Sequence, residues 1–433
     1  MSLPLQLGLV GALYLILVLT AQHVNEHVPH AYMDEIFHVP QAQLFCAGRF
    51  DEWNSKITTL PGLYLLAPLL SWAAGPQMCQ VGTLRAVNAV YALLLALVLL
   101  LIEDDRTHRR RQAGRSALAV IGDVLCPTIA FYHFLFYTDT GGLLFLALTY
   151  WLAVSRRRMA WAALAGAAAV LFRQTNVVWV GLVAALCVLD DHGASATLTS
   201  FAAFVVRNVP LVARRCWPFL VLAAAFGAFV LLNGSIVVGD KENHKASLHF
   251  AQLAYVAVFV YAHIAVSSFR WTHLLELRTR WLSTLLLSVA LGLLVYRFSE
   301  PHAFLLADNR HYTFYIWRRV LDRHGALGRA LVLGPLASIS VHLLQAALRD
   351  AGRGSAFLTL LALATAAALV PSPLLEPRYF SAPLLFTRIH MRQAVAPWRV
   401  AVESGLFAVV TAVQLAVFVH YPLGGNKEDR LMW

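Results

Sequence analysis

The chain has 433 residues, of which 59% are hydrophobic and only 13% are charged, and its mean hydropathy is +0.64. A soluble domain is about half apolar and about a quarter charged, so this composition indicates an integral membrane protein whose backbone pairs within helices. Most of the formal charge of +11 sits in short runs between apolar segments, as in the cytosolic loops of membrane proteins, and we expect no nucleic-acid partner.

Apolar runs long enough to cross a bilayer recur along the chain. The first run is long and has no basic flank, so it is predicted to be an uncleaved span. The stretch 60–74 is short and carries Gly and Pro, which favours an interfacial or re-entrant segment. With a weak span near 379–388, we expect an all-α polytopic protein of about 12 or 13 spans in one domain, 1–433. The good candidates are 3–22, 82–102, 117–136, 140–154, 159–172, 176–190, 217–239, 250–268, 281–297, 329–347, 356–371 and 402–421.

The loops between these spans differ in character. If residue 1 is cytosolic and the spans alternate, more than half of the lysines and arginines fall in cytosolic loops. The opposite side then receives every cluster that mixes acids, histidines, arginines and aromatic residues. Its longest pieces are a first luminal loop, 23–81, and a large luminal loop, 298–328. This sorting depends on leaving 60–74 out of the span count.

The first of these loops contains "HAYMDEIFHVPQAQLFC". Residues 33–43 are predicted to form a short amphipathic helix, on which Asp34, His38 and Gln41 share one face and Glu35 is rotated by about 100°. A carboxylate in an apolar frame at a membrane surface suits a general base, and this face favours Asp34 over Glu35. The alternative is a solvated acid at the headgroup level.

The five cysteines show no C-x-x-C spacing and predict neither a disulfide framework nor a metal site. Cys46 lies in a loop with no evident partner, and the other four lie in or beside apolar segments, where a free cysteine behaves as a small hydrophobe.

Three polar clusters follow between later spans. "TDTGG" begins at Thr138, and its Asp139 either caps a helix or faces a cavity. "FRQTNVVW" places Arg173 in a tight turn, where it either ends a helix or contacts an anion. "GDKENHKASLHFAQ" carries Lys241, which is either a solvated loop cation or a phosphate ligand.

Two further clusters lie near the C-terminal end. "LLADNRHYTFYIWRR" places polar groups beside aromatic rings, a composition typical of a sugar site and also of an interfacial aromatic belt. "LEPRYF" pairs Glu376 with Arg378 at a span entrance, and arginine has the geometry to bind a phosphate diester, although an ion pair between helices explains it equally well.

Several familiar motifs are absent. The sequence contains no G-x-x-x-x-G-K-[ST], no H-E-x-x-H, no G-x-S-x-G and no D-x-D in a soluble fold. A phosphate-bearing substrate would therefore be held by Arg, Lys and His. A lipid-linked donor that arrives from within the bilayer fits this requirement.

Taken together and in this order, "MDEIFHVPQAQ", "KITTLPGLY", "RQTNVVW", "GDKENHKASLHFAQ", "DNRHYTFYIW" and "LEPRYF" resemble the eukaryotic dolichyl-phosphate-glucose-dependent α-1,2-glucosyltransferases, which are multi-span enzymes of the GT-C class. The resemblance extends from about residue 30 to about residue 390, while 104–116 and 191–215 carry no matching motif.

The resemblance implies an inverting transfer of the terminal α-1,2-linked glucose of the N-glycan precursor. The donor would be dolichyl-phosphate-glucose and the acceptor the diglucosylated, dolichyl-pyrophosphate-linked oligosaccharide. The active site would face the lumen of the endoplasmic reticulum, and neither a metal nor another cofactor is expected. Asp34 is then the expected base, with Glu35 in reserve.

The other expected roles follow from chemistry. Donor-phosphate contacts are expected from Arg378, Arg310, His311, Lys241 and Arg173. Sugar or acceptor contacts are expected from His38, Gln41, Asp308, Asn309, Tyr312, Trp317 and Glu376. The nearest alternative is a GT-C enzyme that uses another dolichyl-phosphate sugar such as mannose. A transporter or channel-associated subunit is an alternative of a different class, but transporters commonly have inverted repeats, which this sequence lacks.

Overall fold

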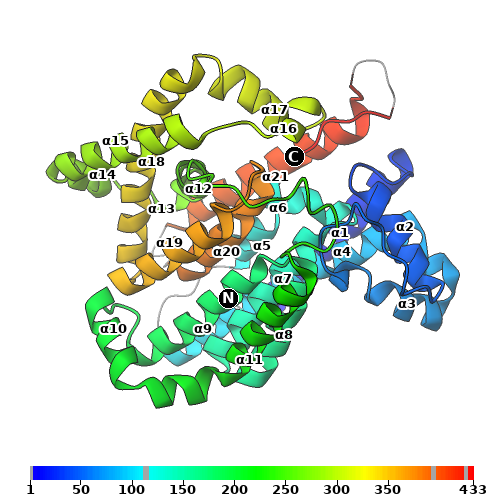
Figure 1. Cartoon of the computed structure of the whole chain (residues 1–433), viewed down its shortest axis with the longest axis horizontal. Coiled ribbons are helices and arrows are strands. Elements are labelled where there is room, and N and C mark those ends of the chain that lie inside the picture. The colour runs from blue at the N-terminus through cyan, green and yellow to red at the C-terminus, as the bar shows by residue number, and fades with distance from the viewer. Residues whose placement is uncertain (1–2, 111–116, 392–395, 424–427) are drawn as a thin grey trace. The chain divides into compact units, whose positions relative to one another are not determined.

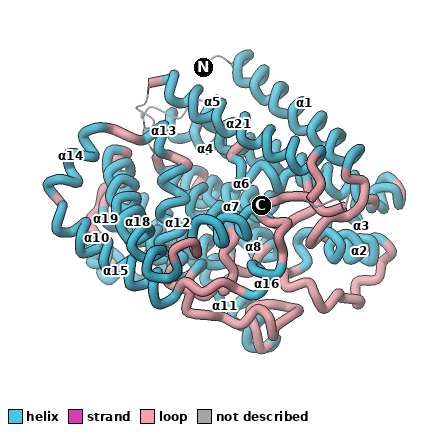
Figure 2. The backbone as a smooth tube through the Cα atoms, turned by 90° about the horizontal axis from the view of Figure 1, so that it is seen from above, coloured by secondary structure: helices cyan, strands magenta, loops and turns pink. Residues whose placement is uncertain are grey.

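The computed structural model describes residues 3–110, 117–391, 396–423 and 428–433. Within these residues the chain is helical, with isolated β-bridges but no strand, and Figure 2 shows helices joined by loops throughout. The all-α class predicted from composition is confirmed. Parts of two predicted basic loops, 111–116 and 392–395, lie outside the described residues.

The described chain divides into two compact units. The single domain predicted for 1–433 stays a prediction. The first unit comprises Met1–Val188, Asn208–His244 and Phe407–His420. Its helices, labelled in Figure 1, are α1 (Leu3–His27), α2 (Glu35–Cys46), α3 (Leu66–Ala74), α4 (Val81–Arg110), α5 (Ala117–Val124), α6 (Pro127–Ala130), α7 (Thr138–Tyr150), α8 (Met159–Phe172), most of α9 (Asn176–His192), α11 (Val209–Asn233) and the end of α21 (Pro397–His420).

The second unit comprises Leu189–Arg207, Lys245–Leu406 and Tyr421–Trp433. Besides the beginning of α21, its helices are α10 (Leu198–Arg207), α12 (Gln252–Ala262), α13 (Ala265–Ser268), α14 (Trp271–Thr279), α15 (Trp281–Phe298), α16 (Ala303–Ala307), α17 (Tyr312–Ile316), α18 (Gly325–Asp350), α19 (Ser355–Leu369) and α20 (Ser381–His390).

Six of the described helices are long and apolar enough to cross a membrane, namely those covering Gly8–His27, Val81–Arg106, Val209–Asn233, Trp281–Phe298, Gly325–Asp350 and Pro397–His420. A seventh is possible if the pair Ala117–Val124 and Pro127–Phe134, bent by 54°, forms one broken span. Several other predicted spans correspond to helices too short to satisfy this length criterion. The predicted span 250–268, for example, is divided into α12 and the short α13.

The most apolar helices keep much of their surface uncovered. Only 11% of the apolar window in Trp281–Phe298 and 17% of that in Val209–Asn233 is buried within the protein. Leu285, Leu286 and Leu293 are each more than half exposed. In water such faces would form large apolar patches, so they indicate contact with lipid. The chain is a multi-span membrane protein.

Close helix packing depends on small residues. In the first unit α1 packs on α4, α4 on α7 and α7 on α8, and in the second unit α15 packs along α18. A Cβ atom on Gly334 would lie 2.5 Å from the carbonyl oxygen of Ser288 and 2.9 Å from the Cα of Gly292. The α15–α18 contact therefore requires glycine at position 334, as is usual where membrane helices approach closely.

Candidate active site

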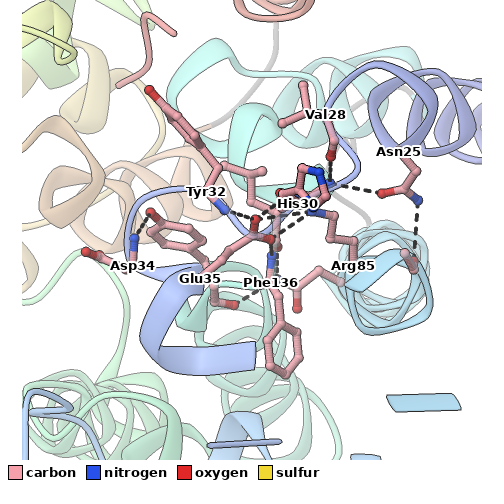
Figure 3. A network of polar contacts seen from close by, with 12 residues as sticks. Asn25, Val28, His30, Tyr32, Asp34, Glu35, Arg85 and Phe136 are labelled. Atoms are coloured by element: carbon pink, nitrogen blue, oxygen red, sulfur yellow. Dashed lines mark hydrogen bonds and ion pairs between the residues drawn. The ribbon is translucent and has the colours of Figure 1, made fainter. Parts of the chain in front are cut away.

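A buried ion pair organises the start of the loop that follows α1. Glu35, the first residue of α2, and Arg85 of α4 are both fully buried. The Nε of Arg85 donates to Oε1 of Glu35 at 2.9 Å, and its Nη2 donates to Oε2 at 2.5 Å. Figure 3 shows this pair at the centre of a polar network. Because an unpaired buried charge is costly, each partner stabilises the other.

The remaining groups of this pair fix the surrounding backbone. Arg85 donates to the carbonyl oxygens of Val28 at 2.6 Å and His30 at 2.9 Å. Glu35 accepts from the backbone N–H groups of Tyr32 at 3.0 Å and Phe136 at 2.6 Å. Both Glu35 oxygens thus bind protein groups (Figure 3), and the geometry favours a positioning role for this side chain.

Asp34 has different surroundings. It precedes α2 and is half-buried, and its backbone N–H donates to the hydroxyl of Tyr137 at 3.1 Å. The preceding residue, Met33, has a φ of +53°, a left-handed conformation that is costly for a side chain of this size. Strained residues cluster at functional sites. The surrounding structure therefore holds Met33 in a strained conformation directly before Asp34.

The two other predicted residues of α2 bind neighbouring loop groups. His38 lies 2.5 Å, through Nδ1, from the hydroxyl of the fully buried Tyr64. Gln41 is fully buried, donates to the carbonyl of Glu52 at 2.7 Å and accepts from the backbone N–H of Asn54 at 2.8 Å. Gln41 therefore orders the loop that follows α2, and its predicted acceptor contact stays a prediction.

A disulfide joins Cys46, at the end of α2, to Cys79, with their Cα atoms 6.6 Å apart. The expectation that Cys46 has no partner was wrong. Cys79 was missed because it lies beside an apolar run, whereas in the structure it ends the short 3₁₀ turn Pro76–Cys79, which packs against α2 and α3. The other cysteines, Cys126, Cys187 and Cys216, are not disulfide-bonded and are buried, as expected.

Three motifs of the first unit converge although they are far apart in sequence. The Nε2 of Gln174 donates to the carbonyl of Thr58 at 2.8 Å. The N–H of Val238 donates to the same carbonyl at 3.1 Å, and the N–H of Asp240 donates to the carbonyl of Ser55 at 2.9 Å. A Cβ on Gly239 would lie 2.4 Å from the Ser55 oxygen, so only glycine permits this approach. The motifs "KITTLPGLY", "RQTN" and "GDK" therefore form one polar cluster of loops.

The predicted phosphate ligands of the first unit already bind protein groups. Nη1 of Arg173 donates to Oδ1 of Asp139 at 2.5 Å, and the Asp139 side chain is 6% exposed. Lys241 is exposed, and its Nζ donates to the carbonyl of Asn233 at 2.7 Å. The Arg173–Asp139 pair lies at the junction of α7 and α8, so a donor phosphate would have to share or replace its hydrogen bonds.

In the second unit, the segment 308–312 binds the end of the described chain. The N–H of Tyr312 donates to the carbonyl of Met432 at 2.8 Å, and the N–H of Met432 donates to the carbonyl of Arg310 at 2.8 Å. The Nδ1 of His311 donates to the carbonyl of Trp433 at 2.9 Å. The predicted phosphate ligands Arg310 and His311 are thus held by a backbone bridge that the sequence did not suggest.

Within this segment Arg310 also binds Asp308, by hydrogen bonds of 2.9 and 2.8 Å. Burial opposes ionisation of Asp308, but hydrogen bonds from Arg310 and its charge outweigh that effect and hold the pKa of the Asp308 carboxyl below its ordinary value. Asn309 is exposed in the turn between them. The segment therefore carries a fixed ion pair at its start.

Two predicted aromatic residues differ in accessibility. Tyr312 is partly exposed, and its ring lies 5.1 Å from that of Trp433, centroid to centroid. Trp317 is 2% exposed, with the guanidinium of Arg329 over its ring at 4.6 Å. This geometry favours packing for Trp317 and leaves Tyr312 as the more accessible ring for stacking on a sugar.

The segment 370–374, directly before the "LEPRYF" motif, lies beside the second half of the "GDKENHKASLHFAQ" motif. Arg378 and Glu376 form an ion pair. The N–H of His249 donates to the carbonyl of Val370 at 2.9 Å, and the Nε2 of Gln252 donates to the carbonyl of Leu374 at 2.7 Å. Within the second unit, His249 and Gln252 are thereby joined to the segment that leads into "LEPRYF", more than a hundred residues away in sequence.

This junction contains two buried polar atoms with no hydrogen-bond partner among the described residues, Nε2 of His249 and Oε1 of Gln252. Buried polar groups are normally paired, so these two atoms have hydrogen-bonding capacity that a water molecule or a substrate hydroxyl would satisfy. Neither residue was singled out from the sequence as a ligand. The signal that could have found them is their place inside a motif shared with a glycosyltransferase family.

Arg85 and Asn88 were also missed, because they lie within an apolar predicted span. Asn88 donates to the carbonyls of Leu135 at 2.6 Å and Tyr137 at 2.8 Å, which fixes the segment that bonds to Asp34 and Glu35. Polar side chains buried in an apolar helix are the available signal for this support. The structure thus groups Asp34, Glu35, His38, Gln41, Arg173 and Lys241 in the first unit, and Asp308, Asn309, Arg310, His311, Tyr312, Trp317, Glu376 and Arg378 in the second.

Comparison with known proteins agrees with the family resemblance of the sequence motifs. The family model described as "DIE2/ALG10 family" matches residues 28–389. Proteins named "Dol-P-Glc:Glc(2)Man(9)GlcNAc(2)-PP-Dol alpha-1,2-glucosyltransferase" are similar over nearly their full length. The Drosophila melanogaster protein is 36% identical, and the Mus musculus protein 32% identical, each over 93% of both chains. The Arabidopsis thaliana protein is 32% identical over 95% of this chain and 96% of its own.

Among solved structures, the cryo-EM structure of arabinosyltransferase EmbB from Mycobacterium smegmatis matches with a TM-score of 0.32 and 14% identity. The match covers 94% of this chain and 41% of that chain. A likeness this weak carries no argument about fold or activity.

Proposed function

Because the chain belongs to the DIE2/ALG10 family, we propose that it is an inverting α-1,2-glucosyltransferase of the lipid-linked oligosaccharide pathway. Its donor is dolichyl-phosphate-glucose, and its acceptor is the diglucosylated, dolichyl-pyrophosphate-linked oligosaccharide. The extent of the similarity supports this, since relatives that carry this name match 93–95% of the chain. The bundle is of the GT-C type, and its active site faces the lumen of the endoplasmic reticulum.

The observation that carries the proposal is the environment of Asp34. Its carboxylate is half-buried at the start of α2, directly after the strained Met33 and on a backbone fixed by the buried pair of Glu35 and Arg85. A general base needs access to substrate and a defined position. Asp34 meets both needs, whereas Glu35 is enclosed by protein donors.

In the proposed reaction, Asp34 takes the proton from the 2-hydroxyl group of the terminal acceptor glucose. The hydroxyl oxygen then forms a bond to C1 of the donor glucose, while the bond from C1 to the phosphate oxygen breaks on the opposite face. Dolichyl phosphate leaves with the electron pair of that bond. Attack opposite the leaving group converts the β-linked donor into an α-linked product.

The departing phosphate requires positive charge or hydrogen-bond donors. Arg378 and Arg310 are proposed for this role, each held in place by an acidic neighbour, and His311, Lys241 and Arg173 are the further candidates. The proposed sugar ligands are His38, Gln41, Asp308, Asn309, Tyr312, Trp317 and Glu376. His249 and Gln252 join them because of their unpaired buried atoms.

The disulfide supports the luminal orientation. Disulfides form and persist in oxidising compartments, which include the lumen of the endoplasmic reticulum. Cys46 and Cys79 flank the interfacial segment proposed at 60–74, and both sulfur atoms must lie in one compartment to pair. The chain between them therefore begins and ends on the same side of the membrane, which fits a segment that does not cross it.

The test is transfer by the purified protein in detergent. The protein receives the diglucosylated lipid-linked acceptor with dolichyl-phosphate-glucose, or with dolichyl-phosphate-mannose in a parallel reaction, and each reaction is run with and without EDTA. We expect a third glucose to appear only with the glucose donor and to be lost in Asp34→Asn. Transfer from the mannose donor instead would overturn the substrate. No transfer from either donor by folded protein would overturn the activity.

A further inference from the structure

Three exposed histidines meet at the ends of two helices of the first unit. His23 and His27 lie one turn apart near the end of α1, so they project from the same face of that helix. His420 is the last residue of α21. The ring centroids of His420 lie 5.1 Å from those of both other histidines, and the His23 and His27 rings are 4.3 Å apart.

The spacing of their nitrogens suits a tetrahedral metal. One nitrogen from each ring lies within 4.8 Å of the other two, and the Nε2 atoms of His23 and His420 are 3.1 Å apart. Zinc binds imidazole nitrogen at about 2.0–2.1 Å, which in tetrahedral geometry places neighbouring ligand nitrogens about 3.3 Å apart. A metal ion could therefore replace the single proton now shared by His23 and His420 with little movement of either ring.

The tautomer of His27 is set by its own helix. Its Nδ1 donates to the carbonyl oxygen of His23 at 2.9 Å, so in the neutral ring the lone pair is on Nε2. Metal-binding histidines typically donate their second ring N–H to a carbonyl or carboxylate, which orients the ring. This hydrogen bond is independent of the His23–His420 contact, and it has the form expected of a metal ligand.

We propose that His23, His27 and His420 form a surface site for a divalent transition metal of the zinc class, with the fourth position open to water. The site joins the end of α1 to the end of α21, two segments separated by almost the whole sequence. Nothing in the proposed transfer reaction uses these residues. The role of the metal is to fix the end of α1, directly before Val28, whose carbonyl binds Arg85.

The first experiment uses the unmodified sequence in detergent, purified with a histidine-free tag. The protein is treated with diethylpyrocarbonate, which modifies accessible imidazoles, with and without ZnCl₂, and each histidine is measured by mass spectrometry. We expect Zn²⁺ to reduce modification of His23, His27 and His420 at least fivefold and to leave the exposed His324 unchanged. Equal modification of the three with and without Zn²⁺ overturns the proposal.

The second experiment compares His420→Ala with His324→Ala. Equilibrium dialysis with Zn²⁺ and elemental analysis gives the bound metal per chain. We expect about one equivalent for the wild type and for His324→Ala, and loss of that equivalent in His420→Ala. Retention of the metal by His420→Ala overturns the proposal. The diethylpyrocarbonate experiment uses the wild-type protein, so it still tests the metal site if His420→Ala fails to fold.

Discussion

Asp34 and Glu35 are adjacent in sequence, yet their carboxylates have opposite surroundings. Glu35 is fully enclosed and paired with Arg85, whereas Asp34 is half-buried on a backbone held by that pair. Glu35 therefore fixes the loop, while Asp34 is the acid that we propose acts on the substrate. Mutations of the two residues should have different consequences.

Asp34→Asn should lower transfer activity by about 10²–10⁴-fold, because the amide cannot accept the proton of the acceptor hydroxyl. The variant should still fold, since asparagine is close in size to aspartate and the hydrogen bond to Tyr137 uses the backbone N–H. Glucose transfer and thermal unfolding would be measured on the same preparation. Full activity in a folded Asp34→Asn variant would exclude Asp34 as the base.

Arg85→Ala should lower the free energy of unfolding by about 3–5 kcal/mol, because it leaves Glu35 buried without its partner. Glu35→Gln should also destabilise, since the Arg85 charge then lacks its counterion. Arg49→Ala is the matched control, because the Arg49–Glu52 pair is exposed and should be nearly neutral. The unfolding temperatures of the three variants would be measured by tryptophan fluorescence. Similar decreases for Arg85→Ala and Arg49→Ala would contradict a stabilising role of the buried pair.

Replacing both Cys46 and Cys79 by serine should lower the free energy of unfolding by about 3–4 kcal/mol, the loop-closure term for a sequence separation of 33. The double variant should lose the sensitivity to reducing agent that the wild type shows in thermal unfolding. Cys216→Ser, at a cysteine that forms no disulfide, should keep this sensitivity. Non-reducing peptide mapping of the wild type checks the pairing directly, and two free thiols at these positions would refute it.

His249 should make stability depend on pH. Burial lowers the pKa of His249 below its ordinary value, and the opposing effects of the Ser372 and Pro373 backbone and of the Glu300 charge are weaker. The unfolded chain therefore binds a proton below about pH 6.5 that the folded chain does not, so stability falls as the pH is lowered through this range. In His249→Gln the unfolding temperature should fall less between pH 7.5 and pH 5.5 than in the wild type. The exposed His324→Gln is the control, and parallel curves for His249→Gln and the wild type would contradict the prediction.

Arg378→Ala should weaken donor binding by about tenfold or more, the equivalent of one charge-assisted hydrogen bond to phosphate. Arg378→Lys should recover part of this loss, since lysine keeps the charge but not the fork of donors. The measurement is the KM for dolichyl-phosphate-glucose alongside kcat. An unchanged donor KM in Arg378→Ala would remove this residue from the phosphate site.

Composition and apolar runs were sufficient to predict an all-α membrane protein, because lipid leaves few other structures available to the backbone. The length of the helices could not be predicted in this way. The apolar stretch 250–268 breaks after Ala262, and 117–136 bends at Pro127, because apolar composition does not show where a helix ends. Residues that lie beside apolar runs were also hard to interpret, as the pairing of Cys79 shows.

The candidate base could be predicted from local sequence, since Asp34 stands among polar and aromatic neighbours within one loop. The support of this loop could not be predicted, because Arg85 pairs with Glu35, the neighbour of Asp34, across 50 residues from within an apolar helix. The contacts of Met432 and Trp433 with the segment 310–312 were missed for a related reason. A short C-terminal peptide has no periodic pattern, so only tertiary contacts reveal where it binds.

The hydrogen bond from the N–H of Phe136 to Glu35 spans 101 positions of sequence, and this has a consequence for biosynthesis. A ribosome releases residues 28–35 long before it releases Phe136, so a nascent chain carries the loop without one of the donors that close it. Arg85 arrives first and neutralises Glu35, and the segment 135–137 then completes the enclosure. The proposed catalytic loop should therefore gain its final protection from proteases only after α4 and the segment that precedes α7 have both been inserted.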